Sequence, residues 1–592
     1  MAPETERAKI ANRLALATIG ALAGLSFWLL VDVLDDIISN PQLFIFVAAG
    51  TLAFFAGLLA LAGPLNLRQA AITAALVSIP SAALLTSASL RFETSDDFFQ
   101  TGHPLLAFAL LISIPLPFLI ARQREGERWN TYAALFDHSW NIVVRYAAAW
   151  LFVGVVWGVV FLSDALFRIV GLEIISDLLD IDGVPFVLTG LVLGLAIAVV
   201  NELSDYVSPY LILQLLRLLL PVLVVVMAVF IVALPFRGLS GLFGGLSAAA
   251  TLMGIVIGGV TLVTTAIDKR QDDAIDSPFM IFAVRALALM TPVLAVLAAY
   301  AVFLRVQQYG WTPDRILAAL IVGFVVAYAA SYAVAVVLRS AWMERIRTVN
   351  IWLALAVIVV AALWLSPVLN PQRISTNSQL ARFEAGKTDL STLDLWPMAR
   401  NWGRAGTAGI ERLAAMTDHP ESDELAARLE RLNDATNRYQ FDMERRAEEN
   451  QDRIAELKDR LPIRPDGAVL SDGAFGQASP SFFNDLEKAC DMTTPAGNPG
   501  CLIVEANLLP GTDGREYFVF YMTSAEAVRT VALRTRAGSY RVEFGPIDLA
   551  NGGTLPSLGP QDIDALSEGN FRVAPAGLNA LKFGDREIFI YP

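Results

Sequence analysis

Two arginines and two aromatic residues flank one short turn in an otherwise apolar stretch. Arg305 and Arg315 lie on either side of Tyr309, Gly310 and Trp311. Two guanidinium groups held close together can bind a phosphate, a lipid headgroup or a carboxylate. We therefore predict a contact with an anion or a lipid at Arg305, Tyr309, Trp311 and Arg315. The alternative is that both arginines dock against nearby acidic residues, where a surface ion pair adds little stability.

A second group of charged residues lies within or at the ends of apolar stretches. It consists of Glu202, Asp205, Arg217 and Arg285. Ionisable groups inside a membrane mark substrate or ion pathways when they face a common cavity. The alternative is a capped helix end at Glu202 and Asp205, with both arginine side chains extending to the inner headgroups.

The chain has only two cysteines, Cys490 and Cys501, and three widely separated histidines, His103, His138 and His419. Ligands for a zinc site are therefore scarce, and we expect no metal and no cofactor. Two cysteines close in sequence fit one disulfide in an oxidising compartment. Two unpaired buried thiols are the alternative.

The sequence carries none of the common catalytic motifs. It has no Gly-x-Ser-x-Gly, no phosphate-binding loop and no His-Glu-x-x-His. Asp562 and Asp564 could be compared with a sugar-nucleotide acid pair, but we interpret them as the start of a short helix. No basic stripe interleaved with aromatic residues is present, which argues against a nucleic-acid partner. We therefore expect a protein that is not an enzyme.

The elements that carry these residues follow from composition. The chain has 592 residues, of which 55% are hydrophobic and 17% charged, whereas soluble domains carry about 25% charged residues. A membrane-spanning helix needs about 20 predominantly apolar residues, and such stretches recur through residue 366. We predict eleven spans, at residues 12–33, 42–63, 67–89, 104–121, 146–168, 184–204, 214–236, 242–267, 281–304, 314–338 and 349–366.

Lysine and arginine are distributed unequally between alternate loops. With the amino terminus inside, the inner segments carry fifteen of these residues and the outer segments carry five, namely Arg91, Arg168, Arg237, Arg305 and Arg315. Inner loops of membrane proteins are enriched in positive charge. We therefore predict a cytoplasmic amino terminus, and eleven spans then place the carboxy-terminal part outside.

Two further segments near the fifth span have an amphipathic pattern. We predict an interfacial helix at residues 121–146, because aromatic residues follow a run of arginines there. Asp137 and His138 within it could handle protons, but a hydrated position at the interface is the simpler interpretation. Residues 172–182 have one apolar and one acidic face, so we predict a helix on the outer surface.

The residues after 366 are charged and mixed in pattern. We predict one charged helix at 424–461 and, from about residue 500, short strands with alternating apolar residues. The fold class is therefore an α-helical polytopic membrane protein with a soluble α+β domain at its carboxy terminus. The predicted divisions are a membrane domain at 1–366, an extracytoplasmic helical segment at 367–465 and a small β-rich domain at 466–592.

Two motifs in the chain resemble those of a known family. The first reads NSQLARFEAGKTDL and then WPMARNWGRAG, and the second is YGWTPDR, from Tyr309 to Arg315. They resemble the bacterial multispan membrane proteins of the domain of unknown function 4153, over most of the chain. The resemblance implies an inner-membrane protein with a soluble carboxy-terminal part and no assigned activity. The matching positions of the first motif are Ser378, Gln379, Arg382, Gly386, Lys387, Gly403 and Gly406.

Three hypotheses about function follow from these patterns. The leading one is a non-enzymatic scaffold or sensor of the bacterial inner membrane with a periplasmic carboxy-terminal domain, whose partners are membrane lipid and an envelope protein. The second is a transporter or lipid-handling protein with a polar cavity lined by Glu202, Asp205, Arg217 and Arg285. The third is a membrane transferase, for which the sequence supplies neither paired acids nor a nucleophile.

Overall fold

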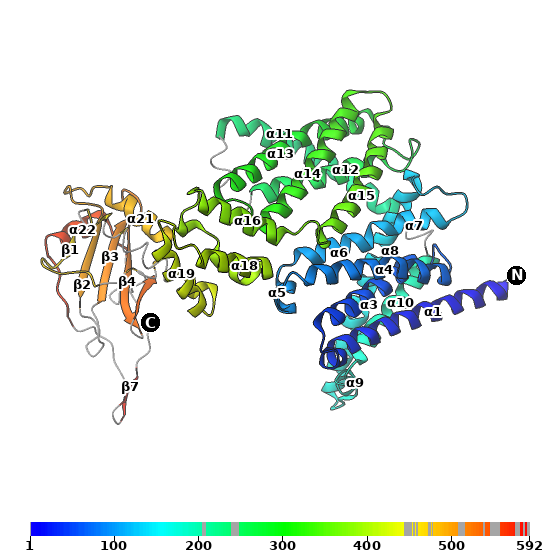
Figure 1. Cartoon of the computed structure of the whole chain (residues 1–592), viewed down its shortest axis with the longest axis horizontal. Coiled ribbons are helices and arrows are strands. Elements are labelled where there is room, and N and C mark those ends of the chain that lie inside the picture. The colour runs from blue at the N-terminus through cyan, green and yellow to red at the C-terminus, as the bar shows by residue number, and fades with distance from the viewer. Residues whose placement is uncertain are drawn as a thin grey trace. The chain divides into compact units, whose positions relative to one another are not determined.

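The chain divides into two compact units, Met1–Leu425 and Ala426–Pro592. Figure 1 shows the helices of the first unit and the small sheet of the second in a computed structural model. The structure describes residues 2–203, 209–237, 248–442, 453, 456–457, 460–471, 475, 478–506, 516–536, 539–544, 557–574, 581–583 and 586–588.

The predicted number of membrane spans is confirmed. Within the described residues, eleven helical segments are long and apolar enough to cross a membrane. The fourth span consists of two helices, α6 and α7, joined at Ile114, and the first continues from α1 through a π-helical turn at Leu29–Val33. The spans are α1 (Ala2–Trp28), α3 (Pro41–Leu61), α4 (Leu67–Ser89), α6 (His103–Ser113) with α7 (Pro115–Gln123), α8 (Tyr132–Ile169), α10 (Val184–Glu202), α11 (Pro209–Arg237), α12 (Ala248–Ile267), α13 (Pro278–Tyr309), α14 (Pro313–Val337) and α15 (Trp342–Leu365).

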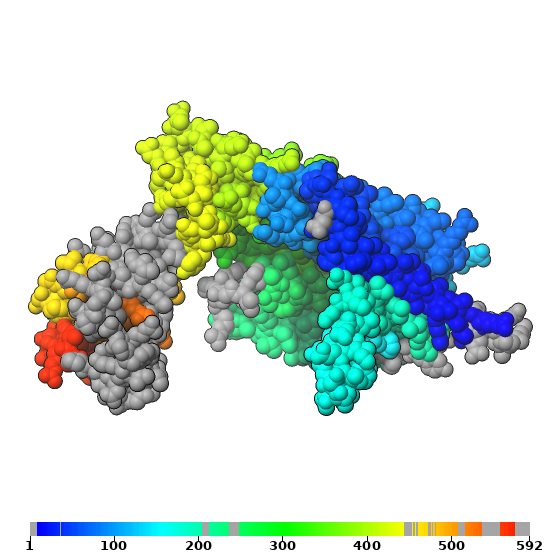
Figure 2. Space-filling view, turned by 90° about the horizontal axis from the view of Figure 1, so that it is seen from below, coloured from blue at the N-terminus to red at the C-terminus, as the bar shows by residue number. Residues whose placement is uncertain are grey.

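The prediction of a separate interfacial helix at 121–146 is wrong. Its second half is the start of α8, a single helix of 38 residues. No proline interrupts residues 132–169, so the helix that begins at the membrane surface continues into the span. After α8 the short α9 (Ile174–Leu179) forms within the predicted surface segment, and Figure 2 shows this part of the chain in cyan, standing out from the blue helix α1.

Helices α1 and α10 pack so closely that only glycine fits between them. A Cβ atom on Gly20 would lie 2.0 Å from the carbonyl oxygen of Gly190, and one on Gly190 would lie 2.1 Å from that of Gly20. A Cβ atom on Gly24 or on Gly194 would likewise lie 2.0 Å from a backbone carbonyl oxygen of the opposite helix. Each helix thus presents a Gly-x-x-x-Gly face, the pattern that lets membrane helices associate by backbone contact.

Helix α15 connects the earlier spans to the later ones. At its start, Trp342 and Ile346 pack in the core formed by α11–α14. At its end, Trp364 and Leu365 pack in a different core, with side chains from α3, α4 and α6. Figure 1 accordingly shows α15 between α14 and α6.

A chain of hydrogen-bonded polar groups around the buried Tyr332 strengthens the same connection. The Tyr332 hydroxyl donates to Asn350 Oδ1 at 2.6 Å, and Asn350 Nδ2 donates to the Tyr132 hydroxyl at 3.4 Å. Thr264 Oγ1 lies 2.9 Å from the same Tyr332 oxygen. These four residues come from α15, α14, α8 and α12. Such a network fixes the register of the packed helices, because an unpaired polar group in this environment would be costly.

Three short helices follow the last span and belong to the first unit. We call residues 371–414 the connector. It contains α16 (Pro371–Glu384), the 3₁₀ turn η3 (Leu390–Thr392), α17 (Leu395–Asn401) and α18 (Gly403–Ala414).

The prediction of one long charged helix at 424–461 is wrong. Helix α19 (Ser422–Asp434) ends early, and residues 435–437 form a bend before a further helical turn at 438–442. Asn437 Oδ1 accepts a hydrogen bond from the Gln440 amide at 2.9 Å, so its side chain caps a new helix start. Capping asparagine competes with helix continuation in this way.

The second unit is built on a five-stranded sheet in the order β1-β2-β3-β4-β5. The pairing of β2 to β5 confirms the predicted antiparallel sheet, while β1, which pairs parallel to β2, was not predicted. Helix α21 (Pro480–Cys490) contributes Phe483 and Leu486 to the core. The strands are β1 (Ile463–Arg464), β2 (Cys501–Ala506), β3 (Glu516–Met522), β4 (Val528–Arg536) and β5 (Ser539–Phe544), with a separate hairpin of β6 (Leu581–Phe583) and β7 (Arg586–Ile588), and α22 (Pro560–Ser567) lies between β5 and β6 in sequence.

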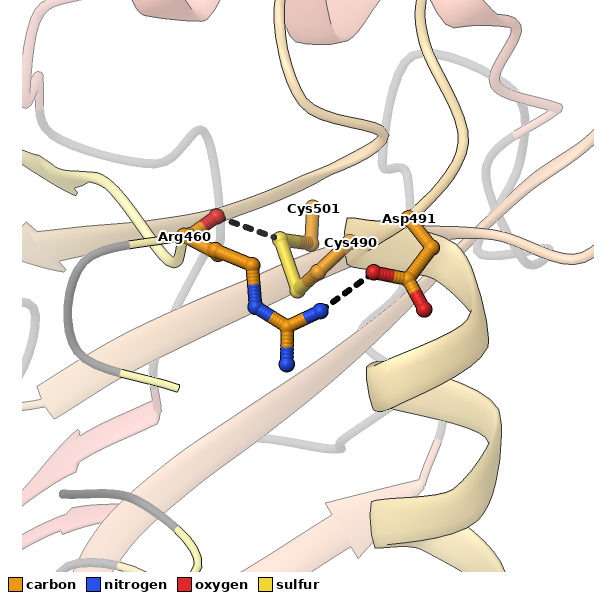
Figure 3. The surroundings of a disulfide bond; sticks show 4 residues. All are labelled: Arg460, Cys490, Asp491 and Cys501. Carbon is orange, nitrogen blue, oxygen red and sulfur yellow. Dashed lines mark hydrogen bonds and ion pairs between the residues drawn. A yellow bond between two sulfur atoms is a disulfide. The ribbon is translucent and has the colours of Figure 1, made fainter. Parts of the chain in front are cut away.

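The predicted disulfide is present. It joins Cys490, the last residue of α21, to Cys501, the first of β2, with their Cα atoms 4.8 Å apart. Figure 3 shows the Arg460 side chain crossing this junction to pair with Asp491. Closing so short a loop stabilises the folded unit by about 2–3 kcal/mol on the chain-entropy account.

We predict that Gly190→Ala and Gly194→Ala each weaken the packing of α1 on α10, because one methyl group forces two backbones apart. The expected loss of stability is about 1–3 kcal/mol per substitution, measured as a lower melting temperature of the detergent-solubilised protein. Gly154→Ala and Gly158→Ala are the matched controls: they have the same spacing on α8, but a Cβ there meets no described atom within 4 Å. An equal fall in melting temperature for the α10 variants and the α8 variants would contradict the close packing of α1 on α10.

Candidate functional site

The turn between α13 and α14 forms as its residue types predict. Helix α13 ends at Tyr309, and Gly310 follows with φ of +73°. Thr312 Oγ1 accepts a hydrogen bond from the Arg315 amide at 3.3 Å, and Pro313 occupies the first helical position. Residues 310–313 thus cap both the end of α13 and the start of α14.

Both arginines of the predicted anion contact lie against the Tyr309 ring. The guanidinium carbons of Arg305 and Arg315 lie 5.7 Å and 5.5 Å from its centre. Neither arginine forms an ion pair with a residue that the structure describes. Arg315 Nη1 instead donates to the carbonyl oxygens of Tyr309 at 3.1 Å and Gly310 at 2.9 Å. Arg315 therefore stabilises the turn, while Arg305 is exposed and donates no hydrogen bond to any residue that the structure describes.

The connector binds the other side of this turn. Gln379 Nε2 donates to the carbonyl oxygens of Tyr309 at 2.8 Å and Trp311 at 3.1 Å. Arg382 Nη2 donates to the carbonyl oxygen of Gln308 at 2.8 Å. The Trp311 amide in turn donates to Ser378 Oγ at 3.3 Å. The three connector residues belong to the first sequence motif and the turn belongs to the second, so the two motifs form one interface.

Gly310 is required at the centre of this interface. A Cβ atom there would lie 2.7 Å from Arg382 Cδ and 2.8 Å from Gln379 Nε2. Its φ also lies in the region that residues with a side chain rarely adopt. The backbone conformation thus selects glycine, and a methyl group here would displace the two side chains that hold the connector.

A second contact holds the connector to the loop after α4. Arg91 Nη2 donates to the carbonyl oxygens of Trp364 at 2.8 Å and Ser366 at 2.6 Å. The Arg91 carbonyl accepts a hydrogen bond from the Arg404 amide at 2.9 Å. Gly403 allows this approach, because a Cβ there would lie 2.4 Å from the same carbonyl oxygen. Burial lowers the pKa of Arg91 to about 10, so it remains charged at neutral pH.

One face of α16 is polar and yet buried. It carries Gln372, Ser375, Thr376 and Gln379, each at most 3% exposed. Both polar atoms of Gln372 and the hydroxyls of Ser375 and Thr376 lack a hydrogen-bond partner among the described residues, as does Gln379 Oε1. This face supplies neutral donors and acceptors but no titratable group, so it suits hydrogen bonding rather than acid–base catalysis.

The predicted intramembrane charges have separate partners. Glu202 pairs with Arg13, whose Nε lies 3.0 Å from Oε1. Arg217 pairs with Asp268, and Arg285 lies 5.4 Å from the centre of the Trp342 ring. Asp205 lies outside the described residues. The structure therefore does not bring Glu202 to either arginine, as a shared polar cavity would require.

Asp268 and two arginines make an interface that sequence patterns did not reveal. Arg217 Nε donates to the carbonyl of Thr265 at 3.0 Å, while Arg347 donates to the carbonyls of Ile267 at 2.5 Å and Asp268 at 3.1 Å. These carbonyls end α12, where cations stabilise unpaired backbone acceptors. Burial raises the pKa of Asp268, opposed by its hydrogen bond from the Lys269 amide and by the Arg217 charge.

The two residues considered for proton handling also have partners. His138 Nε2 lies 2.7 Å from Glu127 Oε2, and Asp137 pairs with Lys269 at 3.1 Å. The latter pair joins α8 to the loop after α12. Over the described part of the chain, no three His, Cys, Asp or Glu residues gather in a way that could hold a metal ion.

The fold and this interface define the class of the protein. It is an integral membrane protein with eleven candidate spans, whose exit helices dock on its own loops. The family model of the domain of unknown function (DUF4153) matches residues 16–413, and the chain belongs to this family. That match begins inside α1, continues through the other ten spans and ends at residue 413, one residue before the end of α18. Neither the curated proteins nor the solved structures contain a match to the chain.

We predict that Gly310→Ala loosens the connector and lowers the melting temperature of the purified protein. The matched control is Gly386→Ala, where φ is +62° but a Cβ meets no described atom within 4 Å. Both variants carry the cost of a positive φ, and this cost is larger at Gly310, whose ψ of −176° lies in a region that essentially only glycine adopts. Only Gly310→Ala also brings a methyl group against Gln379 and Arg382. Limited proteolysis should therefore cut residues 371–414 faster in Gly310→Ala alone. Equal cleavage in both variants would contradict the interface.

Proposed function

We propose that the protein is a scaffold or sensor of the bacterial inner membrane that holds a soluble α+β domain on the extracytoplasmic side. The observation that carries this proposal is the docked connector. Residues 371–414 are fixed to two loops of the membrane unit by Gln379, Arg382 and the Arg91 backbone. A chain that only tethered a free domain would have no need of an exit segment fixed in this way.

Two independent observations support the extracytoplasmic side. The loops that carry Arg91 and Tyr309 contact Ser366 and Gln379, which follow the last span. Eleven spans that alternate in direction require this, because these loops and the end of the last span then lie on the same side. These loops lie on the arginine-poor side of the predicted topology. The Cys490–Cys501 disulfide fits an oxidising compartment. We therefore propose that the amino terminus is cytoplasmic and that the partner of the soluble unit is a component of the envelope.

We also propose that the turn at residues 305–315 contacts the headgroup of an anionic lipid. Arg305 is exposed, lies beside the half-exposed Tyr309 ring and has no carboxylate partner among the described residues. Aromatic residues and arginines at a span end are typical of headgroup depth. Arg315, by contrast, holds the turn itself.

For the side of the soluble unit, we predict that Val469→Cys is alkylated in intact cells by a membrane-impermeant maleimide. Val469 is 74% exposed, and the native cysteines are bonded to each other, so the new thiol is the reactive one. Ser340→Cys, in the exposed loop before α15, is the matched control and should react only after the membrane is broken. The reverse pattern would contradict the extracytoplasmic role.

For the lipid contact, we predict that Arg305→Ala lowers the retention of phosphatidylglycerol several-fold in native mass spectrometry while the melting temperature stays unchanged. Arg315→Ala should lower both, because its hydrogen bonds to Tyr309 and Gly310 are lost. Arg168→Ala is the control, since Arg168 is an exposed arginine paired with Asp164 at 2.9 Å. Unchanged phosphatidylglycerol retention in Arg305→Ala would end the lipid proposal.

A further inference from the structure

A groove lies where α15 joins the earlier spans to the later ones. It has a volume of about 460 Å³ and is lined by α6, α12, α14 and α15. That volume lies within the range of small-molecule sites, about 300–1,000 Å³. Its walls are almost entirely apolar, and its polar side chains are His103, Thr261, Tyr328 and Trp364.

The groove is about as long as one leaflet of a bilayer. On α6 its lining runs from His103 to Ile114, and on α14 from Leu317 to Tyr328. At 1.5 Å per residue each run covers about 16 Å, whereas the whole hydrocarbon layer is about 30 Å thick. His103 is the first residue of its span. The groove therefore extends from the membrane boundary to near the midplane, as an acyl chain does.

His103 provides a hydrogen-bond donor at the boundary end. Its side chain is buried, and Nδ1 accepts a hydrogen bond from Trp364 Nε1 at 3.2 Å. An indole nitrogen can only donate, so Nδ1 of His103 carries no proton, and the neutral ring holds its proton on Nε2. This Nε2–H has no partner among the described residues, although the imidazole lines the groove.

A second large groove has no histidine in its wall. It has a volume of about 610 Å³ and is lined by α1, α3, α8 and α10. The Tyr146 hydroxyl in its wall donates to the carbonyl of Ala56 at 2.6 Å, and Thr189 Oγ1 donates to that of Pro185 at 2.7 Å. Thr51 and Trp150 also line this groove, but no histidine does, so it is an apolar groove without an imidazole and serves as the comparison for the groove at His103.

We propose that the groove at His103 binds one acyl chain of a membrane phospholipid, whose ester carbonyl accepts a hydrogen bond from His103 Nε2. Ester carbonyls lie at the boundary of the hydrocarbon layer, at the depth of the first residue of a span. The apolar walls between Leu317 and Tyr328 hold the chain. The site does not depend on which side the soluble unit faces, so it stands or fails separately from the scaffold role.

The test uses the full-length protein in nanodiscs that contain phosphatidylglycerol with a photoactivatable diazirine in one acyl chain. We expect the label on peptides of α6 and α14. Leu320→Trp, which fills the groove and leaves His103 in place, should reduce that labelling at least fivefold. Leu52→Trp fills the comparison groove and should leave it unchanged. Equal labelling of α6 and α14 in wild type and Leu320→Trp would show general bilayer contact only and overturn the proposal.

The hydrogen bond is tested with His103→Phe and His103→Gln in the same nanodiscs. His103→Phe removes the donor and should lower labelling about three- to tenfold, in line with about 1 kcal/mol for one hydrogen bond. His103→Gln should keep part of the labelling, because the glutamine amide also donates a hydrogen bond. Unchanged labelling in His103→Phe would overturn the assigned hydrogen bond. A photoreactive ubiquinone analogue forms the second arm, since a quinone also joins carbonyls to an apolar tail. If the quinone labels α6 and α14 and an excess of phosphatidylglycerol does not reduce that labelling, the phospholipid assignment is overturned.

Discussion

The docking of the connector on the membrane unit depends on one contact. Gln379 and Arg382 donate hydrogen bonds to backbone carbonyls of the turn between α13 and α14. The turn can offer these carbonyls because Gly310 takes a positive φ and leaves room for both side chains. From within the turn, Arg315 donates to one of the same carbonyls, that of Tyr309, and also to the carbonyl of Gly310. Each bond contributes only about 0.5–1.5 kcal/mol, so the interface is specified by shape as much as by strength.

This contact joins the last spans to the connector within the part of the chain that the family model matches. The family match ends at residue 413, one residue before the end of α18, so spans and connector belong together. The packing agrees, because the first compact unit also includes the connector. The sheet and its disulfide lie beyond the match and are the part of the chain to which a function of its own can be assigned. In the membrane unit, α15 crosses between two cores and lines the groove for which we propose an acyl chain.

The sequence predicts those structural features that depend only on the residues of one local segment. Span number follows from hydropathy, the strands from alternation, and the turn at 310–313 from local capping preferences. Prediction failed where the outcome depends on a partner. Gly20 and Gly24 share their spacing with Gly154 and Gly158, yet only the first pair meets another helix. The same limit applies to the site, since the turn was found from its residue types, but Gln379 and Arg382 could be placed against it only by the fold.

The most direct measurement of the central claim is hydrogen exchange of the full-length protein in nanodiscs, followed by mass spectrometry. Amides of α16 should remain protected long after those of the exposed α9 (Ile174–Leu179) have exchanged, because α16 is held against the turn at 308–311. Exchange of α16 as fast as that of α9 would show a free tether and contradict the docked connector.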